Sequence, residues 1–159
     1  MNNINYYDKI KYDKNNDIYT LKIKLNNLQT IYMEFSLINL NRYEPFVECK
    51  WYNVCLSIHG KRFTMYDNMD KKISTGKDPI YNFIITRNMF NAMETFVIDN
   101  TIKQKKDLVI CIHWEDNRRR DAYYKVLSRK GYKYAKMPWG TKVIMKKFKW
   151  KDYEDIEFE

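Results

Sequence analysis

The chain has 159 residues, of which 45% are hydrophobic and 16% aromatic, so it can bury a core and is too apolar to be disordered. Lysine and arginine number 29 against 20 aspartate and glutamate residues, a formal net charge of +9. This charge favours anionic partners, namely nucleic acid, phosphorylated cofactors or an acidic protein, and it serves solubility equally well.

The chain begins with a polar segment, and no apolar run is long enough to span a membrane. We therefore expect a cytoplasmic protein with no membrane contact. The many Lys, Asn, Ile and Tyr residues are typical of an A/T-rich bacterial or phage genome. If a phage encodes the protein, the compartment is the cytoplasm of its bacterial host.

The three cysteines, Cys49, Cys55 and Cys111, include no C-x-x-C pair, and the chain has only two histidines. This pattern predicts neither a disulfide framework nor a four-ligand zinc site. We expect no bound metal, reduced thiols, and cysteines that pack in the core.

In the first half of the chain, a polar lead-in over residues 1–17 precedes several predicted strands. The alternation of apolar and charged residues from Ile18 to Leu25 predicts a half-buried strand, and Thr30 to Leu37 a second one. The run from Phe46 to Ile58 is also β-prone, but its alternation slips, so it is either one bulged strand or two strands. Arg62 to Tyr66 is a further strand candidate.

A helix is predicted to begin at Pro79. Asp78 can cap it, and proline suits the first helical position. We expect it to end near Asp99 and Asn100. Its predicted core-facing stripe consists of Phe83, Ile84, Phe90, Met93 and Val97.

The second half begins with the continuous apolar run from Leu108 to Ile112, which predicts a central strand covered on both faces. A helix capped by Asp116 and Asn117 should follow over residues 118–130 and stop at Gly131. Its expected apolar face consists of Ala122, Tyr123, Val126 and Leu127.

A closing hairpin is predicted from Tyr132 to Lys136 and from Lys142 to Phe148, around a turn at Pro138-Trp139-Gly140. Together these elements predict an α/β (α+β) fold built on one twisted sheet. We expect a single domain over residues 1–151 and an acidic tail over residues 152–159.

One segment carries a family resemblance. Residues 117–132 read Asn-Arg-Arg-Arg-Asp-Ala-Tyr-Tyr-Lys-Val-Leu-Ser-Arg-Lys-Gly-Tyr. A strand followed by Asn, a helix that carries Tyr, and Gly-Tyr before the last strands resembles the GNAT superfamily of acetyl-CoA-dependent N-acetyltransferases. The resemblance covers Ser74 to Lys147. It implies a GNAT-like fold, in which helices flank a central mixed, mostly antiparallel twisted sheet. It also implies transfer of an acetyl group from acetyl-CoA to an unknown amine.

The resemblance implies a cofactor site at the start of the first helix. Thr75, Gly76 and Lys77 lie there, where free N–H groups and the helix dipole attract phosphate. The alternative is an ordinary capped loop, because Asp78 would compete for the same N–H groups.

Asn117, Arg119 and Arg120 are the other implied cofactor-binding residues. Positive charges in the first turn of a helix oppose its dipole. Arg118, Arg119 and Arg120 therefore either hold an anion or are neutralised by their acidic neighbours.

Two adjacent tyrosines are the catalytic candidates. Tyr124 lies seven residues after Asn117, where the family often places the tyrosine that protonates the leaving thiolate. Tyr123 points about 100° away on a helix, so we expect one ring in the core and the other at the cleft. Glu48 is the candidate general base, with Glu34 and His59 as alternatives.

A second function from another class stays open at this point. A non-catalytic GNAT-like protein of phage or bacterial origin, a binding module or virion component, would use its basic face to bind protein or nucleic acid. Aromatics and lysines alternate at Lys133-Tyr134-Ala135-Lys136 and over residues 146–151, as in nucleic-acid-binding surfaces. The same pattern fits a solvated hairpin face with half-buried Tyr and Trp better, and the sequence has no helix-turn-helix, zinc-finger or RNP signature. The loop from Lys71 to Pro79 has one glycine where the family usually has two small residues, which favours the non-catalytic alternative.

Overall fold

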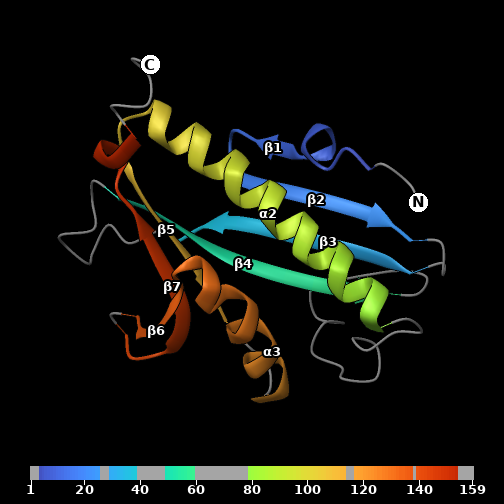
Figure 1. Cartoon of the computed structure of the whole chain (residues 1–159). Coiled ribbons are helices and arrows are strands. Elements are labelled where there is room, and N and C mark those ends of the chain that lie inside the picture. The colour runs from blue at the N-terminus through green and yellow to red at the C-terminus, as the bar shows by residue number, and fades with distance from the viewer. Residues whose placement is uncertain are drawn as a thin grey trace. The chain divides into compact units, whose positions relative to one another are not determined.

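The computed structural model describes residues 4–25, 29–38, 49–59, 79–113, 117–137 and 139–153. The strands form one seven-stranded sheet in the order β1-β2-β3-β4-β5-β7-β6. Figure 1 shows the elements along the chain. Their bounds are η1 Tyr7–Lys9, β1 Lys11–Asp13, β2 Ile18–Lys24, β3 Thr30–Leu37, β4 Cys49–His59, α2 Pro79–Lys103, β5 Asp107–Ile112, α3 Asn117–Leu127, η4 Ser128–Lys130, β6 Lys133–Lys136 and β7 Lys142–Phe148.

The sheet is mixed and mostly antiparallel, as predicted. β1 with β2, β2 with β3, β5 with β7 and β6 with β7 all pair antiparallel. β4 and β5 pair parallel, from Cys49 opposite Asp107 to Val54 opposite Ile112. Parallel neighbours need a long crossover connection, and α2 lies in that connection along the chain.

Contacts divide the chain into two compact units, residues 1–36 with 55–97 and residues 37–54 with 98–159. The prediction of a single domain over residues 1–151 stays a prediction. α2 is the longest helix that the structure describes, and neither it nor any other described helix is apolar enough over a sufficient length to cross a bilayer. The predicted strand from Arg62 to Tyr66 lies outside the described residues.

In the first unit, β2 and β3 bury alternate side chains beneath α2 (Figure 1). Side chains in a strand alternate between faces, so the apolar positions of the pair share one face. Phe35 of β3 meets Phe90 of α2 with ring centroids 5.8 Å apart. The buried members on the two strands are Tyr19, Leu21, Ile23, Ile31, Met33 and Phe35.

The core-facing stripe predicted for α2 was wrong at its first two residues. Phe83 and Ile84 are 44% and 41% exposed, whereas Ile85 and Met89 are buried. The true buried face includes Asn82, whose Nδ2 donates a hydrogen bond of 2.9 Å to Oε1 of Gln29. An apolar pattern cannot reveal a buried polar residue, because only its tertiary partner makes the burial acceptable. The helix also continues to Lys103, beyond the predicted end near Asn100.

The predicted lead-in contains regular structure. η1 and the three-residue β1 precede β2, and Tyr12 of β1 stacks on Tyr19 of β2 at a centroid distance of 4.4 Å. All three residues of β1 are exposed, so its sequence lacks the alternation of apolar and polar residues that predicts a half-buried strand. A helical turn and an edge strand of this length were therefore not predicted.

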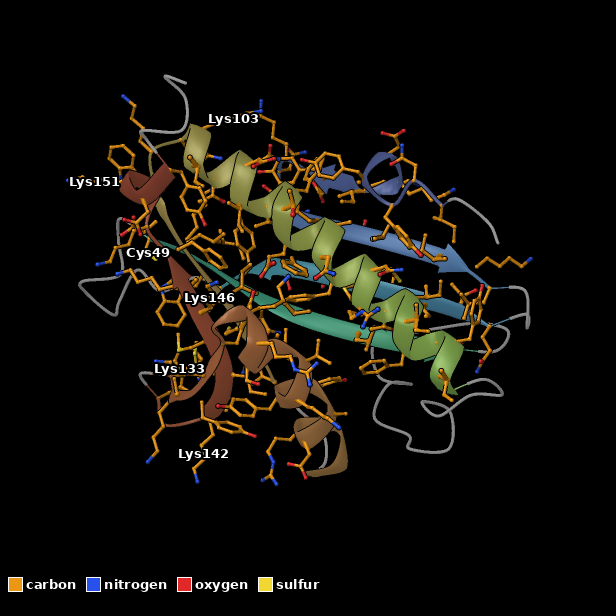
Figure 2. The ribbon with its side chains drawn as sticks, in the orientation of Figure 1. Cys49, Lys103, Lys133, Lys142, Lys146 and Lys151 are labelled. Atoms are coloured by element: carbon orange, nitrogen blue, oxygen red, sulfur yellow. The ribbon has the colours of Figure 1, made fainter. Side chains whose placement is uncertain are left out.

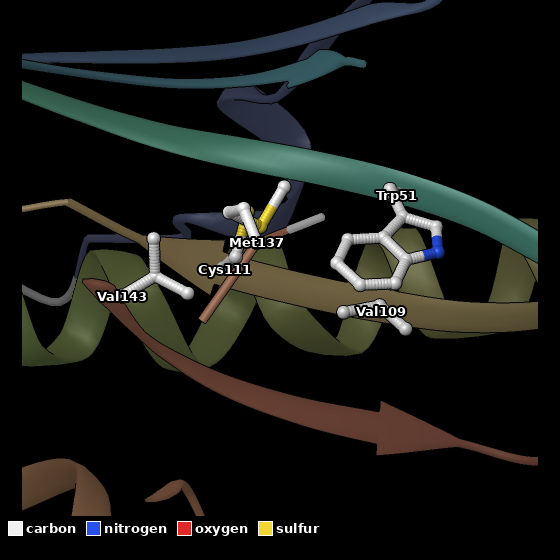
Figure 3. Close-up of a cluster of buried hydrophobic side chains, with 5 residues drawn as sticks. All are labelled: Trp51, Val109, Cys111, Met137 and Val143. Atoms are coloured by element: carbon white, nitrogen blue, oxygen red, sulfur yellow. The ribbon is translucent and has the colours of Figure 1, made fainter. Parts of the chain in front are cut away.

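In the second unit, β5 is the central strand that its apolar run predicted. Five of its six residues are buried. Trp51, Val109, Cys111, Met137 and Val143 form a buried cluster on one face (Figure 3). Because side chains alternate, Leu108 and Ile110 lie on the opposite face, which is also buried.

The helix predicted over residues 118–130 is α3 followed by η4. Gly131 ends the segment with φ +94, the left-handed conformation that glycine adopts without strain. Lys146 of β7 donates a 2.6 Å hydrogen bond from Nζ to the Lys130 carbonyl and so ties the helix end to the hairpin. On the predicted apolar face, Leu127 is buried, but Ala122 is exposed.

Candidate functional site

Several predicted site residues lie outside what the structure describes. Thr75, Gly76, Lys77 and Glu48 fall in undescribed segments of the chain. For Asn117 and Arg119, only the backbone of α3 is described. Their roles stay predictions.

Arg120 does have a described acidic neighbour. Its guanidinium contacts Oδ1 of Asp121 at 3.0 Å, through both Nε and a terminal nitrogen. The Arg120 side chain is 34% exposed and that of Asp121 68%, so the pair lies at the surface. Surface pairs contribute about 0–1 kcal/mol, which leaves the arginine available to a second anion.

Tyr123 and Tyr124 are both half-buried, so neither is the core residue that we expected one of them to be. Tyr124 instead stacks on Tyr134 of β6, with ring centroids 4.3 Å apart and ring planes 19° apart. α3 and β6 thus bring together two aromatic residues that the sequence analysis treated separately. The catalytic role of either helix tyrosine stays a prediction.

Of the alternative general bases, Glu34 is described in full. It lies on β3 and accepts a 2.8 Å hydrogen bond from the Tyr32 hydroxyl. Burial, and then this carboxylate, raise the pKa of Tyr32 above its usual value. For His59, the structure describes the backbone as the last residue of β4.

The sequence analysis missed a polar pair at the carboxyl end of the parallel strands. His113 follows β5 directly, and its Nδ1 is in contact with Oδ1 of Asn53 on β4. An amide oxygen accepts hydrogen bonds, so this contact favours the proton on Nδ1 and leaves the lone pair of the neutral ring on Nε2. The carboxyl ends of parallel strands commonly carry ligand sites, so a histidine directly after an apolar run was a usable signal.

An open basin lies where α3 meets the β6–β7 hairpin. It has a volume of about 550 Å³ and is lined by Arg120, Tyr134, Ala135, Lys136 and Lys142. Among the lining residues that the structure describes, three of five are cationic. Arg120 comes from the second turn of α3, Tyr134 and Lys136 from β6, and Lys142 from the start of β7. We call this set the hairpin basin.

Cationic and aromatic side chains both project from this hairpin. Figure 2 shows Lys133 and Lys142 extending from β6 and β7. Tyr134 is 47% exposed, and Trp139 in the connection between the two strands is 45% exposed. The hairpin basin therefore combines positive charge with an accessible aromatic ring.

Neither Cys49 nor Cys111 provides an activated nucleophile. Burial raises the pKa of the half-buried Cys49 thiol to about 11, so it is protonated at neutral pH. Cys111 is fully buried and donates from Sγ to the Tyr52 carbonyl at 3.5 Å, which confirms its predicted core position. Cys49 and Cys55 are half-buried rather than core residues. No group of three or more His, Cys, Asp and Glu side chains that could hold a metal ion occurs among the described residues.

Comparison of the chain with models of known protein families found no match, and comparisons with curated proteins and with solved structures found no significant match either.

Proposed function

We propose that the chain is a divergent GNAT-like protein that transfers an acyl group from acyl-CoA to an amine. One observation carries the proposal: the parallel pair β4–β5, with α2 between the two strands along the chain, is followed by α3, Gly131-Tyr132 and an antiparallel hairpin. This is the order of elements that the family resemblance implies.

Acyl transfer forms a C–N bond and breaks the C–S bond of the thioester. The amine must lose a proton as it attacks the carbonyl carbon, and the leaving thiolate must gain one. The contact of His113 Nδ1 with Asn53 favours the tautomer that a proton acceptor at Nε2 needs. We assign His113 as a candidate base, in addition to Glu48. Tyr124 is the candidate proton donor to the thiolate.

Acetyl-CoA supplies the acyl group and three anionic phosphates. Thr75, Gly76, Lys77, Asn117, Arg119 and Arg120 are the residues assigned to hold it. Arg120 can supply positive charge to a phosphate, because its guanidinium is partly exposed and its contact with Asp121 lies at the surface.

Calorimetric titration of the full chain with acetyl-CoA tests the proposal. We expect micromolar binding, and we expect Gly76→Glu to abolish it without changing the melting temperature. Release of free CoA is then measured across a panel of amines. His113→Gln and Tyr124→Phe should each lower kcat by about 10²-fold or more at unchanged acetyl-CoA affinity. Tyr12→Phe, on β1, is the matched control. No calorimetric signal with acetyl-CoA contradicts the proposal.

A second candidate function is a module that binds an anionic macromolecule through its basic face. The hairpin basin carries this candidate, because Arg120, Lys136 and Lys142 all line it. The ligand that binds distinguishes the two candidate functions. A binding module is retained on a polyanion in a salt-sensitive manner and does not bind acetyl-CoA.

A further inference from the structure

We propose that the hairpin basin binds single-stranded nucleic acid, with one base stacked on Tyr134 and the adjoining phosphate held by Lys136, Lys142 and Arg120. This inference rests on the second candidate function and names its partner. It does not depend on acyl transfer.

The phosphate position follows from the register of the hairpin. Lys136 of β6 lies directly opposite Lys142 of β7. Residues paired in this way have Cβ atoms about 5 Å apart, and like charges there destabilise the hairpin. A phosphate between the two ammonium groups replaces repulsion with two attractions. Arg120 supplies a third positive charge to the same basin from α3.

Lysines on this hairpin also have a purely structural use. β6 is the last strand in the sheet order, and lysines protect an edge strand from pairing with other chains. Edge protection accounts for Lys133 and Lys136. It does not account for an arginine contributed by a helix, nor for an exposed tyrosine ring among the cations.

The base position follows from the tyrosine stack. One face of the Tyr134 ring lies against Tyr124, which fixes the ring, and 47% of the residue remains exposed. A base stacked on the exposed part of the Tyr134 ring would extend an existing aromatic stack. The basin volume of about 550 Å³ is ample for one nucleotide. Trp139, 45% exposed in the hairpin connection, offers a second ring for a neighbouring base.

The aromatic ring favours a single strand over the other polyanions. A base in a duplex is already stacked on its neighbours, so its face is not available to Tyr134. An acidic peptide would engage the lysines and the arginine, and it would gain nothing from an exposed tyrosine ring. Stacking combined with phosphate contacts is the mode by which single strands bind without strong sequence preference.

Fluorescence anisotropy on the full chain tests the inference. The probe is labelled oligo(dT) of about 12 nucleotides, compared with a duplex of equal length and with an oligoglutamate peptide. We expect the single strand to bind more tightly than both competitors, and its affinity to fall as salt rises from about 50 to 200 mM.

Two sets of variants separate the base from the phosphate. Tyr134→Ala should weaken binding about tenfold, whereas Tyr134→Phe keeps the ring and should bind as the parent does. Lys136→Ala with Lys142→Ala should make the slope of log K against log salt shallower by about 1.4, for two lost phosphate contacts. Lys24→Ala, an exposed lysine of β2, is the matched charge control and should change the slope by less than half as much.

Each outcome decides the inference. Equal affinity for duplex or for oligoglutamate overturns it, as does an unchanged affinity in Tyr134→Ala or the same loss in Tyr134→Phe. Because acetyl-CoA binding is measured separately, failure here leaves the acyltransferase proposal standing. If none of the three anionic probes binds, the second candidate function is overturned as well.

Discussion

Two antiparallel strand pairs of this chain, β2–β3 and β6–β7, obey the same pairing geometry and use it differently. On the inner face of β2–β3 the partners are apolar, such as Leu21 opposite Met33 and Tyr19 opposite Phe35. β6 buries none of its four residues, and its final pair sets Lys136 opposite Lys142. The first pair is built for packing, and the second keeps charge and an aromatic ring at the surface.

The outer faces sharpen the contrast. In β2–β3 the partly exposed partners are compatible: Thr20 is opposite Glu34, Lys22 opposite Tyr32 and Lys24 opposite Thr30. No register pair of β2–β3 sets like charges against each other. A hairpin that accepts such a pair gives up stability, so the lysine pair of β6–β7 points to a use other than folding.

The largest expected effect contrasts an aromatic residue from each pair. Phe35→Ala on β3 should cost about 3–5 kcal/mol, because the ring is fully buried against Phe90. Tyr134→Ala on β6 should cost about 0.5–1.5 kcal/mol, the contribution of its stack on Tyr124. Guanidinium unfolding measures both. Equal costs would show that the β6 ring belongs to the core and would remove the contrast.

An intermediate effect concerns the two glycines that flank the hairpin strand β6. Gly131 and Gly140 both have positive φ, +94 and +96, so alanine at either should cost about 1–2 kcal/mol. A Cβ at Gly131 would also lie 3.3 Å from Lys146 Nζ, whereas at Gly140 it would meet nothing within 4 Å.

Gly131→Ala should therefore cost about 0.5–1.5 kcal/mol more than Gly140→Ala, through loss of the hydrogen bond from Lys146 to Lys130. Urea unfolding of the two variants measures the difference. Equal losses of unfolding free energy would mean that the Lys146 side chain moves aside without cost. The hydrogen bond from Lys146 to Lys130 would then contribute little to the stability of the hairpin.

The smallest expected effect has the opposite sign. Lys142→Glu places a carboxylate opposite Lys136, and it should stabilise the hairpin by about 0.2–1 kcal/mol. The same change should abolish the preference for single-stranded DNA. Thermal unfolding and anisotropy measure the two effects. Lys24→Glu, opposite Thr30, is the control and should alter neither by a comparable amount. Destabilisation by Lys142→Glu would show that the lysine pair is not a folding cost.

Local sequence patterns predicted most of the elements. Alternation located β2 and β3, the apolar run located β5, and Gly131 located the end of α3 and η4. These patterns succeed because each reports a property of one segment: a period, a run or a permitted backbone angle. The mixed, mostly antiparallel sheet was predicted from the family resemblance and not from these local patterns.

The candidate site could be predicted only in parts. The pattern Lys133-Tyr134-Ala135-Lys136 pointed to a basic, aromatic hairpin, and Arg120 was chosen for the charge of its helix start. Their meeting in one basin was not predicted, nor was the contact of His113 with Asn53. Those facts join residues far apart in the chain, through the register of β6 on β7 and of β4 on β5.

By itself, the sequence determined most of the segments that form helices and strands and which residues carry charge, because those depend on composition and periodicity. Tertiary structure alone decided which face of α2 is buried, since Asn82 becomes acceptable in the interior only through Gln29. It also decided that Tyr124 supports Tyr134 and that Lys136 faces Lys142. Non-local pairing set those neighbours, and no period within one segment encodes them.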